Sequence, residues 1–114
     1  MQEKEIKIKV VLDDRNTPES IFWQADDQPG TERIACKAFL LSLFDKEHLD
    51  TFKLDLWTKD LQVNEMDKFM FQTLRGLVDT YYKATNNGEL ANELQRFVHY
   101  FGEKTGIIEP ESED

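Results

Sequence analysis

Apolar and polar residues alternate in two neighbouring segments near the start of the chain. Aliphatic side chains occupy every second position of Ile6–Leu12, with Lys7 and Lys9 between them. The alternation resumes over Ser20–Ala25. A period of two is typical of a strand with one buried face, and the Asp, Asn and Pro residues between positions 13 and 18 favour a turn. The two segments therefore predict an antiparallel hairpin.

The next segment is apolar on all sides. Thr31 has a side chain that suits a helix N-cap, and the residues after it predict a helix that runs to about Lys46. At 100° per residue its apolar side chains spread around the whole circumference: Ile34, Ala35, Ala38, Phe39, Leu40, Leu41, Leu43 and Phe44. A helix of this kind is buried on more than one side. We therefore expect it at the centre of the fold or shared with a partner.

The middle of the chain predicts a third strand and a second helix. Apolar residues alternate with polar residues and Trp57 over Thr51–Thr58. Asn64 suits an N-cap, with the negative charge of Asp67 in the first turn, and begins a helix to about Ala84. The expected inner arc of this helix is Met66, Phe69, Met70, Leu74, Leu77 and Tyr81, widened on one flank by Phe71, Val78 and Tyr82.

A last helix is predicted from Glu89 to about Lys104, after a left-handed cap or turn at residues 86–88. Its apolar stripe is Leu90, Leu94, Phe97, Val98 and Phe101, and Gly106 ends it. The predicted order is β-β-α-β-α-α. We expect an α+β fold in which three helices pack mainly on one face of a small three-stranded sheet. The connection through the first helix could be a right-handed parallel crossover.

Length and charge limit the classes of protein that fit. The 114 residues suit one domain, expected over residues 1–108. Residues 109–114 hold four carboxylates and no apolar side chain, so we expect a disordered acidic tail. The net charge is −9, and −5 without these four carboxylates, which argues against nucleic-acid binding. No signal peptide or membrane-length apolar run is present, so we expect a soluble, cytoplasmic protein without direct membrane insertion.

Motifs for catalysis and metal binding are missing from the sequence. No glycine-rich phosphate loop occurs, and His48 and His99 are 51 residues apart without metal-ligand spacing. Cys36, the single cysteine, is expected to be an inert core residue. The acidic pairs at residues 13–14 and 26–27 are expected at opposite ends of the first hairpin, as solvated turn residues. We expect no enzymatic activity, no cofactor and no metal.

One surface of the predicted sheet is a candidate for binding. If the main apolar row of each strand faces inward, the opposite face carries aromatic residues among charges. The candidate interaction surface consists of Val11, Phe22, Lys53, Asp55, Trp57 and Lys59. An aromatic anchor within a polar rim is typical of protein interfaces. Alternatively, single exposed aromatic residues are common, and Trp57 beside Lys53 or Lys59 is only a cation–π pair.

The string LDLWTKD at residues 54–60, followed by VNEM at 63–66, resembles the central block of the GldC family of gliding-motility proteins of Bacteroidota. The similarity extends to residues 71–74, 79–80, 84–85, 100–101 and 103–104. Before this block it includes residues 5–7, 12–13, 38 and 41–42. Residues 61–64 read LQVN where the family tends toward Met-Pro-Val-Asp, and Asn64 keeps the capping function.

The resemblance implies a small soluble protein that supports gliding alongside membrane-associated gliding proteins, without an enzymatic activity or a cofactor. We therefore expect a non-enzymatic accessory protein that acts by protein–protein contact. Its expected partners are other gliding-machinery proteins or a second copy in a homodimer. The alternative is a small-ligand-binding or enzymatic module with a pocket between sheet and helices, lined by Tyr81, Tyr82 or His99.

Overall fold

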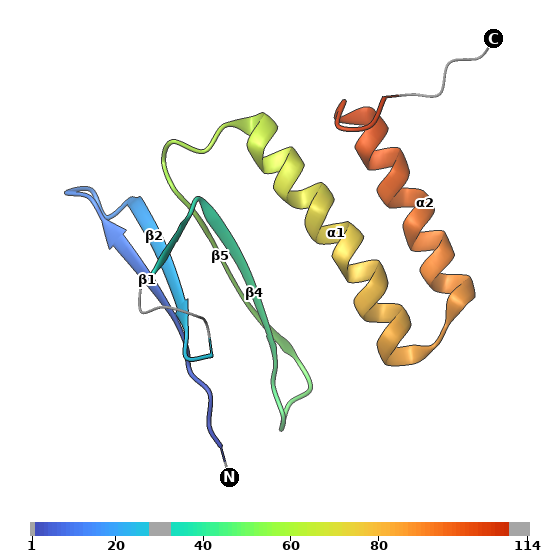
Figure 1. The fold of residues 1–114 in the computed structure, drawn as a ribbon, viewed down its shortest axis with the longest axis horizontal. Helices are drawn as coiled ribbons and strands as arrows, with labels where there is room; N and C mark the ends of the chain where they lie inside the picture. The colour runs from blue at the N-terminus through green and yellow to red at the C-terminus, as the bar shows by residue number, and fades with distance from the viewer. Residues whose placement is uncertain (1, 28–32, 110–114) are drawn as a thin grey trace. The chain divides into compact units, whose positions relative to one another are not determined.

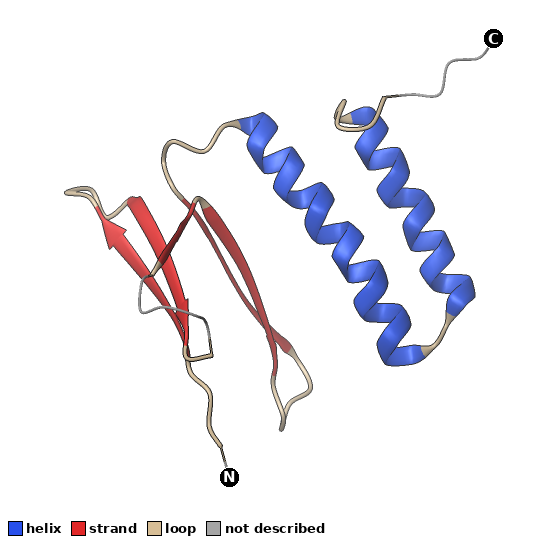
Figure 2. Cartoon of the chain, in the orientation of Figure 1, coloured by secondary structure: helices blue, strands red, loops and turns tan. Residues whose placement is uncertain are grey.

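The structure, a computed structural model, describes residues 2–27 and 33–109. The chain divides into two compact units, Met1–Leu61 and Gln62–Asp114. The first unit holds five strands in the described residues, and the second holds two helices (Figures 1 and 2). The predicted α+β class is confirmed, although the number and kind of elements differ from the prediction. The acidic segment 110–114 lies outside the described residues.

Three strands of the first unit form one antiparallel sheet. β1 (Ile6–Leu12), β2 (Pro18–Ala25) and β3 (Ile34–Cys36) lie in the order β1-β2-β3. The predicted hairpin of β1 and β2 is confirmed, and its register pairs Ile8 with Trp23. β2 begins at Pro18, two residues earlier than predicted, because the first residue of a strand tolerates a missing N–H.

The predicted helix from Thr31 to Lys46 is wrong. Residues 34–44 form β3 and then β4 (Ala38–Phe44), while Thr31 lies outside the described residues. β4 pairs with β5 (Thr51–Trp57) in an antiparallel two-stranded sheet. Phe39, Leu41 and Leu43 form one face of β4, and Leu40 and Phe44 lie on the other. A strand that is apolar on both faces gives the same composition as a helix that is apolar all round.

The predicted arrangement of one three-stranded sheet with three helices is therefore wrong. The described residues form a three-stranded sheet, a two-stranded sheet and two helices. The helical crossover considered above is wrong, because residues 34–44 form β3 and β4, and β3 pairs with β2 in the antiparallel sense. The predicted third strand is confirmed as β5. His48 lies in the turn between β4 and β5 rather than beyond a helix end.

Backbone hydrogen bonds and one ion pair join the segment after β5 to the rest of the first unit. The backbone N–H of Thr58 donates to the carbonyl of Lys37 at 2.8 Å, and that of Lys59 donates to the carbonyl of Pro18 at 3.0 Å. The Lys59 ammonium lies 3.1 Å from a carboxylate oxygen of Asp13. Ile21 and Thr58 are the residues of the described part of this unit that are buried from solvent.

The second unit is a helical hairpin of α1 (Val63–Thr85) and α2 (Gly88–Lys104). Asn64 is not the N-cap of α1, because the helix begins before it. The cap is Gln62, whose backbone N–H donates to a carboxylate oxygen of Glu65 at 3.0 Å. The predicted left-handed cap is confirmed at Asn86, where φ is 58°. The side chain of Asn87 then accepts a hydrogen bond from the N–H of Leu90 at 3.0 Å and caps α2.

The two helices pack along a single seam. Its buried residues are Phe71 and Val78 of α1 and Ala91 and Val98 of α2. Leu74, Tyr81, Leu94, Phe101 and Ile108 pack against them. Positions seven residues apart repeat on each helix, as in an antiparallel coiled-coil contact. The predicted inner arc of α1 is therefore rotated, because Phe71 and Val78 are buried while Leu77 is 49% exposed. A contact between two helices buries a narrower stripe than the full set of apolar residues.

We predict opposite effects of alanine at two helical glycines. At Gly102, which is buried, a Cβ atom would lie 2.6 Å from Ile108 Cδ1 and 2.7 Å from Phe71 Cε1. Gly102→Ala should therefore destabilise the protein by about 1–3 kcal/mol. At Gly76, exposed within α1, no such neighbour lies within 4 Å, so Gly76→Ala should stabilise by roughly 0.5–1 kcal/mol. Urea unfolding of both variants measures the two signs, and equal effects would contradict the packing at Gly102.

We also predict a pH-dependent contribution from Asp13. Hydrogen bonds from the backbone N–H of Thr17 and then of Arg15, followed by the Lys59 ammonium, lower the pKa of Asp13. Because the folded pKa lies below the unfolded value of about 3.9, this contribution is present above about pH 5 and is lost as the pH falls through the folded pKa. Asp13→Asn should therefore be less stable than the parent at pH 7, and the difference should shrink below about pH 4.

Thermal unfolding of the parent and of Asp13→Asn from pH 7 to pH 2 tests this expectation. Asp14→Asn is the matched control, because it removes the same charge from an exposed position in the same turn. A stability difference for Asp13→Asn that persists unchanged at pH 2 would contradict the assignment.

Candidate interaction surfaces

The six residues of the predicted interaction surface are distributed over both sheets of the first unit. Val11 and Phe22 belong to the three-stranded sheet, on the face opposite Ile8 and Trp23. Lys53, Asp55 and Trp57 lie on one face of β5, as their alternation predicts. Lys59 follows β5 in the segment joined to β2. The structure groups the β5 residues most clearly.

Trp57 is the most exposed aromatic residue of the predicted surface. Its indole is half exposed, at 51%, and its cross-strand neighbour is Ala38, whose methyl group is too small to cover the ring. The nearby lysines are paired with carboxylates. Lys53 is paired with Asp55, and Lys59 lies 3.1 Å from Asp13 and 3.8 Å from Glu19. These ion pairs favour an exposed anchor over the alternative in which a lysine occupies the indole face.

Phe22 is in a different environment. The guanidinium of Arg33 lies 4.2 Å from the centre of its ring, and the residue is only partly exposed. A cation above a ring is attracted to its negative face. Phe22 is therefore already engaged within the sheet, whereas Trp57 is not covered in the same way.

A second exposed surface was missed because residues 34–44 were expected to be helical. One face of the β4–β5 hairpin carries six apolar side chains and no charge: Phe39, Leu41, Leu43, Phe52, Leu54 and Leu56. Phe52 is 62% exposed on this face. Residues 39–43 read FLLSL, which is apolar on both faces of the strand, so no local alternation could have identified this face.

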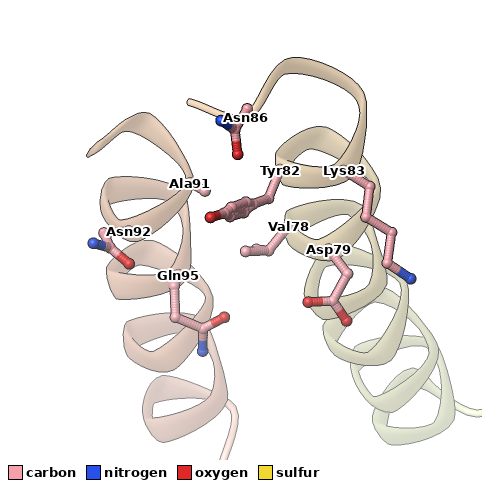
Figure 3. A pocket seen from close by; sticks show the side chains of 8 residues that line it. All are labelled: Val78, Asp79, Tyr82, Lys83, Asn86, Ala91, Asn92 and Gln95. Carbon is pink, nitrogen blue, oxygen red and sulfur yellow. The ribbon is translucent and has the colours of Figure 1, made fainter. Parts of the chain in front are cut away.

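The helical hairpin has a polar groove near its closed end, with a volume of about 630 Å³ (Figure 3). Its base contains the buried side chains of Val78 and Ala91. Figure 3 shows the Tyr82 hydroxyl directed across the groove toward α2. The remaining lining residues are Asp79, Lys83, Asn86, Asn92 and Gln95. Amides, a hydroxyl and two opposite charges make this groove suited to hydrogen bonding.

The other side of the hairpin has an apolar depression of about 440 Å³. It is lined by Tyr81, Leu90, Glu93, Leu94 and Phe97. Tyr81 and Tyr82, which were predicted to line one pocket, therefore face two separate depressions. His99 lines neither of them, and its ring nitrogen lies 2.6 Å from a carboxylate oxygen of Glu103.

The environments of the single cysteine and of His48 are as follows. Cys36 lies in β3 and not in a helix, and partial burial raises the pKa of its thiol, which lowers the thiolate fraction at neutral pH. His48 pairs with Asp45 at 2.8 Å on the exposed turn after β4. Within residues 2–27 and 33–109, no three His, Cys, Asp or Glu side chains gather where they could hold a metal ion.

Neither helix has the length and hydropathy needed to cross a membrane, and this finding covers the described residues only. No curated protein and no solved structure matches the chain at a significant level. The model of one protein family does match, over residues 18–107, and its description is gliding motility-associated protein GldC-like. The match includes the LDLWTKD string and confirms the resemblance seen in the sequence. The chain therefore belongs to the GldC-like family of gliding motility-associated proteins.

Proposed function

We propose that this protein is a non-enzymatic accessory component of the gliding apparatus that acts by protein–protein contact through the Trp57 face of β5. The observation that carries the proposal is the half-exposed indole of Trp57 beside the Lys53–Asp55 ion pair. Tryptophan is enriched among the residues that contribute most to binding at interfaces, and charged residues around it form the usual polar rim.

Covering the exposed indole of Trp57 would contribute favourably to a contact. A tryptophan side chain buries up to about 250 Å², so the exposed half of Trp57 offers roughly 125 Å². At about 25 cal/mol per Å², covering it gives a gross gain of roughly 3 kcal/mol, from which the costs of association are subtracted. The register on β5 holds the ring on the same face as Asp55 and Lys53, so the anchor is presented by a strand rather than by a loop.

Charge and family membership indicate the kind of partner. The chain carries a net charge of −9, which disfavours an acidic partner surface. We expect a neutral or basic patch on another protein of the gliding machinery, with a concave apolar site that receives the indole. The Lys53–Asp55 pair gives the rim both signs of charge, which suits hydrogen bonding at the edge of such a patch.

The polar groove of the helical hairpin supports a second candidate function. Its volume falls in the range of small-molecule sites, and its amide and hydroxyl groups suit a small polar ligand. A ligand-binding module would show a thermal shift with such a ligand that Gln95→Ala abolishes. In that case Trp57→Ala would leave ligand binding unchanged.

We predict that Trp57→Ala leaves the fold nearly intact and weakens capture of gliding-machinery partners by about tenfold or more. The test is a pull-down from a gliding bacterium that lacks its own copy, together with colony spreading after complementation. Phe52→Ala is the matched control, since it removes a similarly exposed ring from the opposite face of the same strand.

The proposal requires a difference between these two variants. If Trp57→Ala unfolds the protein, the indole is part of the core and the proposed contact is wrong. If Trp57→Ala and Phe52→Ala capture partners equally well, the Trp57 face is not the binding surface.

A further inference from the structure

Apart from the residues buried between α1 and α2, one side of the helical hairpin carries exposed apolar residues. Leu77 of α1 is 49% exposed, and Leu90 and Phe97 of α2 are 51% and 52% exposed. On α1, Met70, Leu77 and Ala84 are spaced seven residues apart, and on α2, Leu90 and Phe97 have the same spacing. Each helix therefore presents these apolar residues along one face. We name these five residues the outer apolar row. Leu90 and Phe97 line the apolar depression together with Tyr81, four residues from Leu77.

The apolar residues of α1 and those of α2 lie at the same positions along the axis of the helical hairpin. A Cβ atom at Gly102 of α2 would touch Phe71 of α1, so these two residues lie opposite each other in the contact between the helices. Leu77 lies six residues beyond Phe71, and Phe97 lies five residues before Gly102, which brings the two to about the same height in antiparallel helices. Leu77 and Phe97 therefore form the middle of a continuous apolar surface.

We propose that two copies of the chain stack on this surface, hairpin against hairpin, in an antiparallel four-helix bundle. The arrangement is isologous, because the outer apolar row of each copy covers the depression of the other. The row itself is uncharged, so a charged partner gains nothing along its length. The proposal goes beyond the contact through Trp57 and does not depend on it, because it uses the residues of the other unit.

The charges at the two ends of the surface favour a second copy in the antiparallel orientation. Lys104 lies seven residues beyond Phe97, at the open end of the hairpin, with its ammonium 5.7 Å from the centre of the Tyr100 ring. Glu93 lines the depression toward the closed end, and its exposed carboxylate also lies 3.2 Å from Arg96. Antiparallel stacking brings Lys104 of one copy toward Glu93 of the second copy at both ends. Stacking with the hairpins parallel would instead place α2 of one copy against α1 of the second copy, so this pairing of Lys104 with Glu93 would be lost.

The surface is large enough for such a contact. α1 has 23 residues and α2 has 17, so at about 1.5 Å per residue they are about 35 and 25 Å long. Two helices packed about 10 Å apart then offer a side of roughly 600 Å². This area is of the same order as the ~800 Å² that each partner buries in a stable interface.

Light scattering of the full chain tests the proposal. The parent should have twice the monomer mass of 13.4 kDa at micromolar concentration. Phe97→Glu places a charge in the outer apolar row and should weaken dimerisation at least tenfold. Gln95→Glu is the matched control, with the same new charge on the same helix but in the polar groove, and it should remain dimeric. Circular dichroism checks that both variants keep their helices.

A second pair of substitutions, which swaps the charges of Glu93 and Lys104, tests the proposal even if Phe97→Glu does not fold. Glu93→Lys should weaken the dimer severalfold because it sets two lysines together, and adding Lys104→Glu should restore it. A parent that is monomeric at all concentrations assigns the surface to another occupant and overturns the proposal. A dimer that Phe97→Glu leaves unchanged, or a double exchange that restores nothing, overturns it as well.

Discussion

Each unit of this protein buries few side chains of its described residues, and this constraint explains most of its exposed apolar surface. In the described part of the first unit Ile21 and Thr58 are buried, and in the second unit the buried residues lie along one helical seam. A single strand or helix has two sides, so each unit leaves apolar residues outside its own core. In the helical hairpin the exposed apolar residues lie on the side away from the seam, whereas β5 is exposed on both faces, with Phe52 at 62% and Trp57 at 51%.

The sequence predicted the elements whose periodicity is simple. β1, β2 and β5 alternate with a period of two, and the C-terminal helices have clear caps and breaks, so these were identified within one or two residues. Residues 34–44 were not, because six of the eleven, not counting alanine and cysteine, are aliphatic or aromatic, and they lie on both faces of the strands. Composition cannot separate such a strand from a buried helix, and the pairing of β4 with β5, the next strand along the chain, decides the outcome.

In the candidate surfaces, too, the sequence predicts what depends on neighbouring residues and does not predict what depends on contacts between distant residues. Alternation alone placed Trp57, Lys53 and Asp55 on one face, since that depends only on neighbours in the strand. The pairing of Lys59 with Asp13 joins residues 46 positions apart, so no local pattern could predict it. The orientation of α1 was also missed, because it depends on which residues meet α2, and Leu77 and Val78 are equally hydrophobic in the sequence.

The link between the two helices has a kinetic consequence. Only Asn86 and Asn87 separate α1 from α2, and both make local capping hydrogen bonds. The contacts of the helical seam nearest this turn therefore close a very short loop, which requires little loss of chain entropy. The strand unit must instead bring β2 to β3 and β4 to β5 across longer intervals. Because local contacts form faster than distant ones, we expect the helical hairpin to assemble early in folding, while the strands are still pairing.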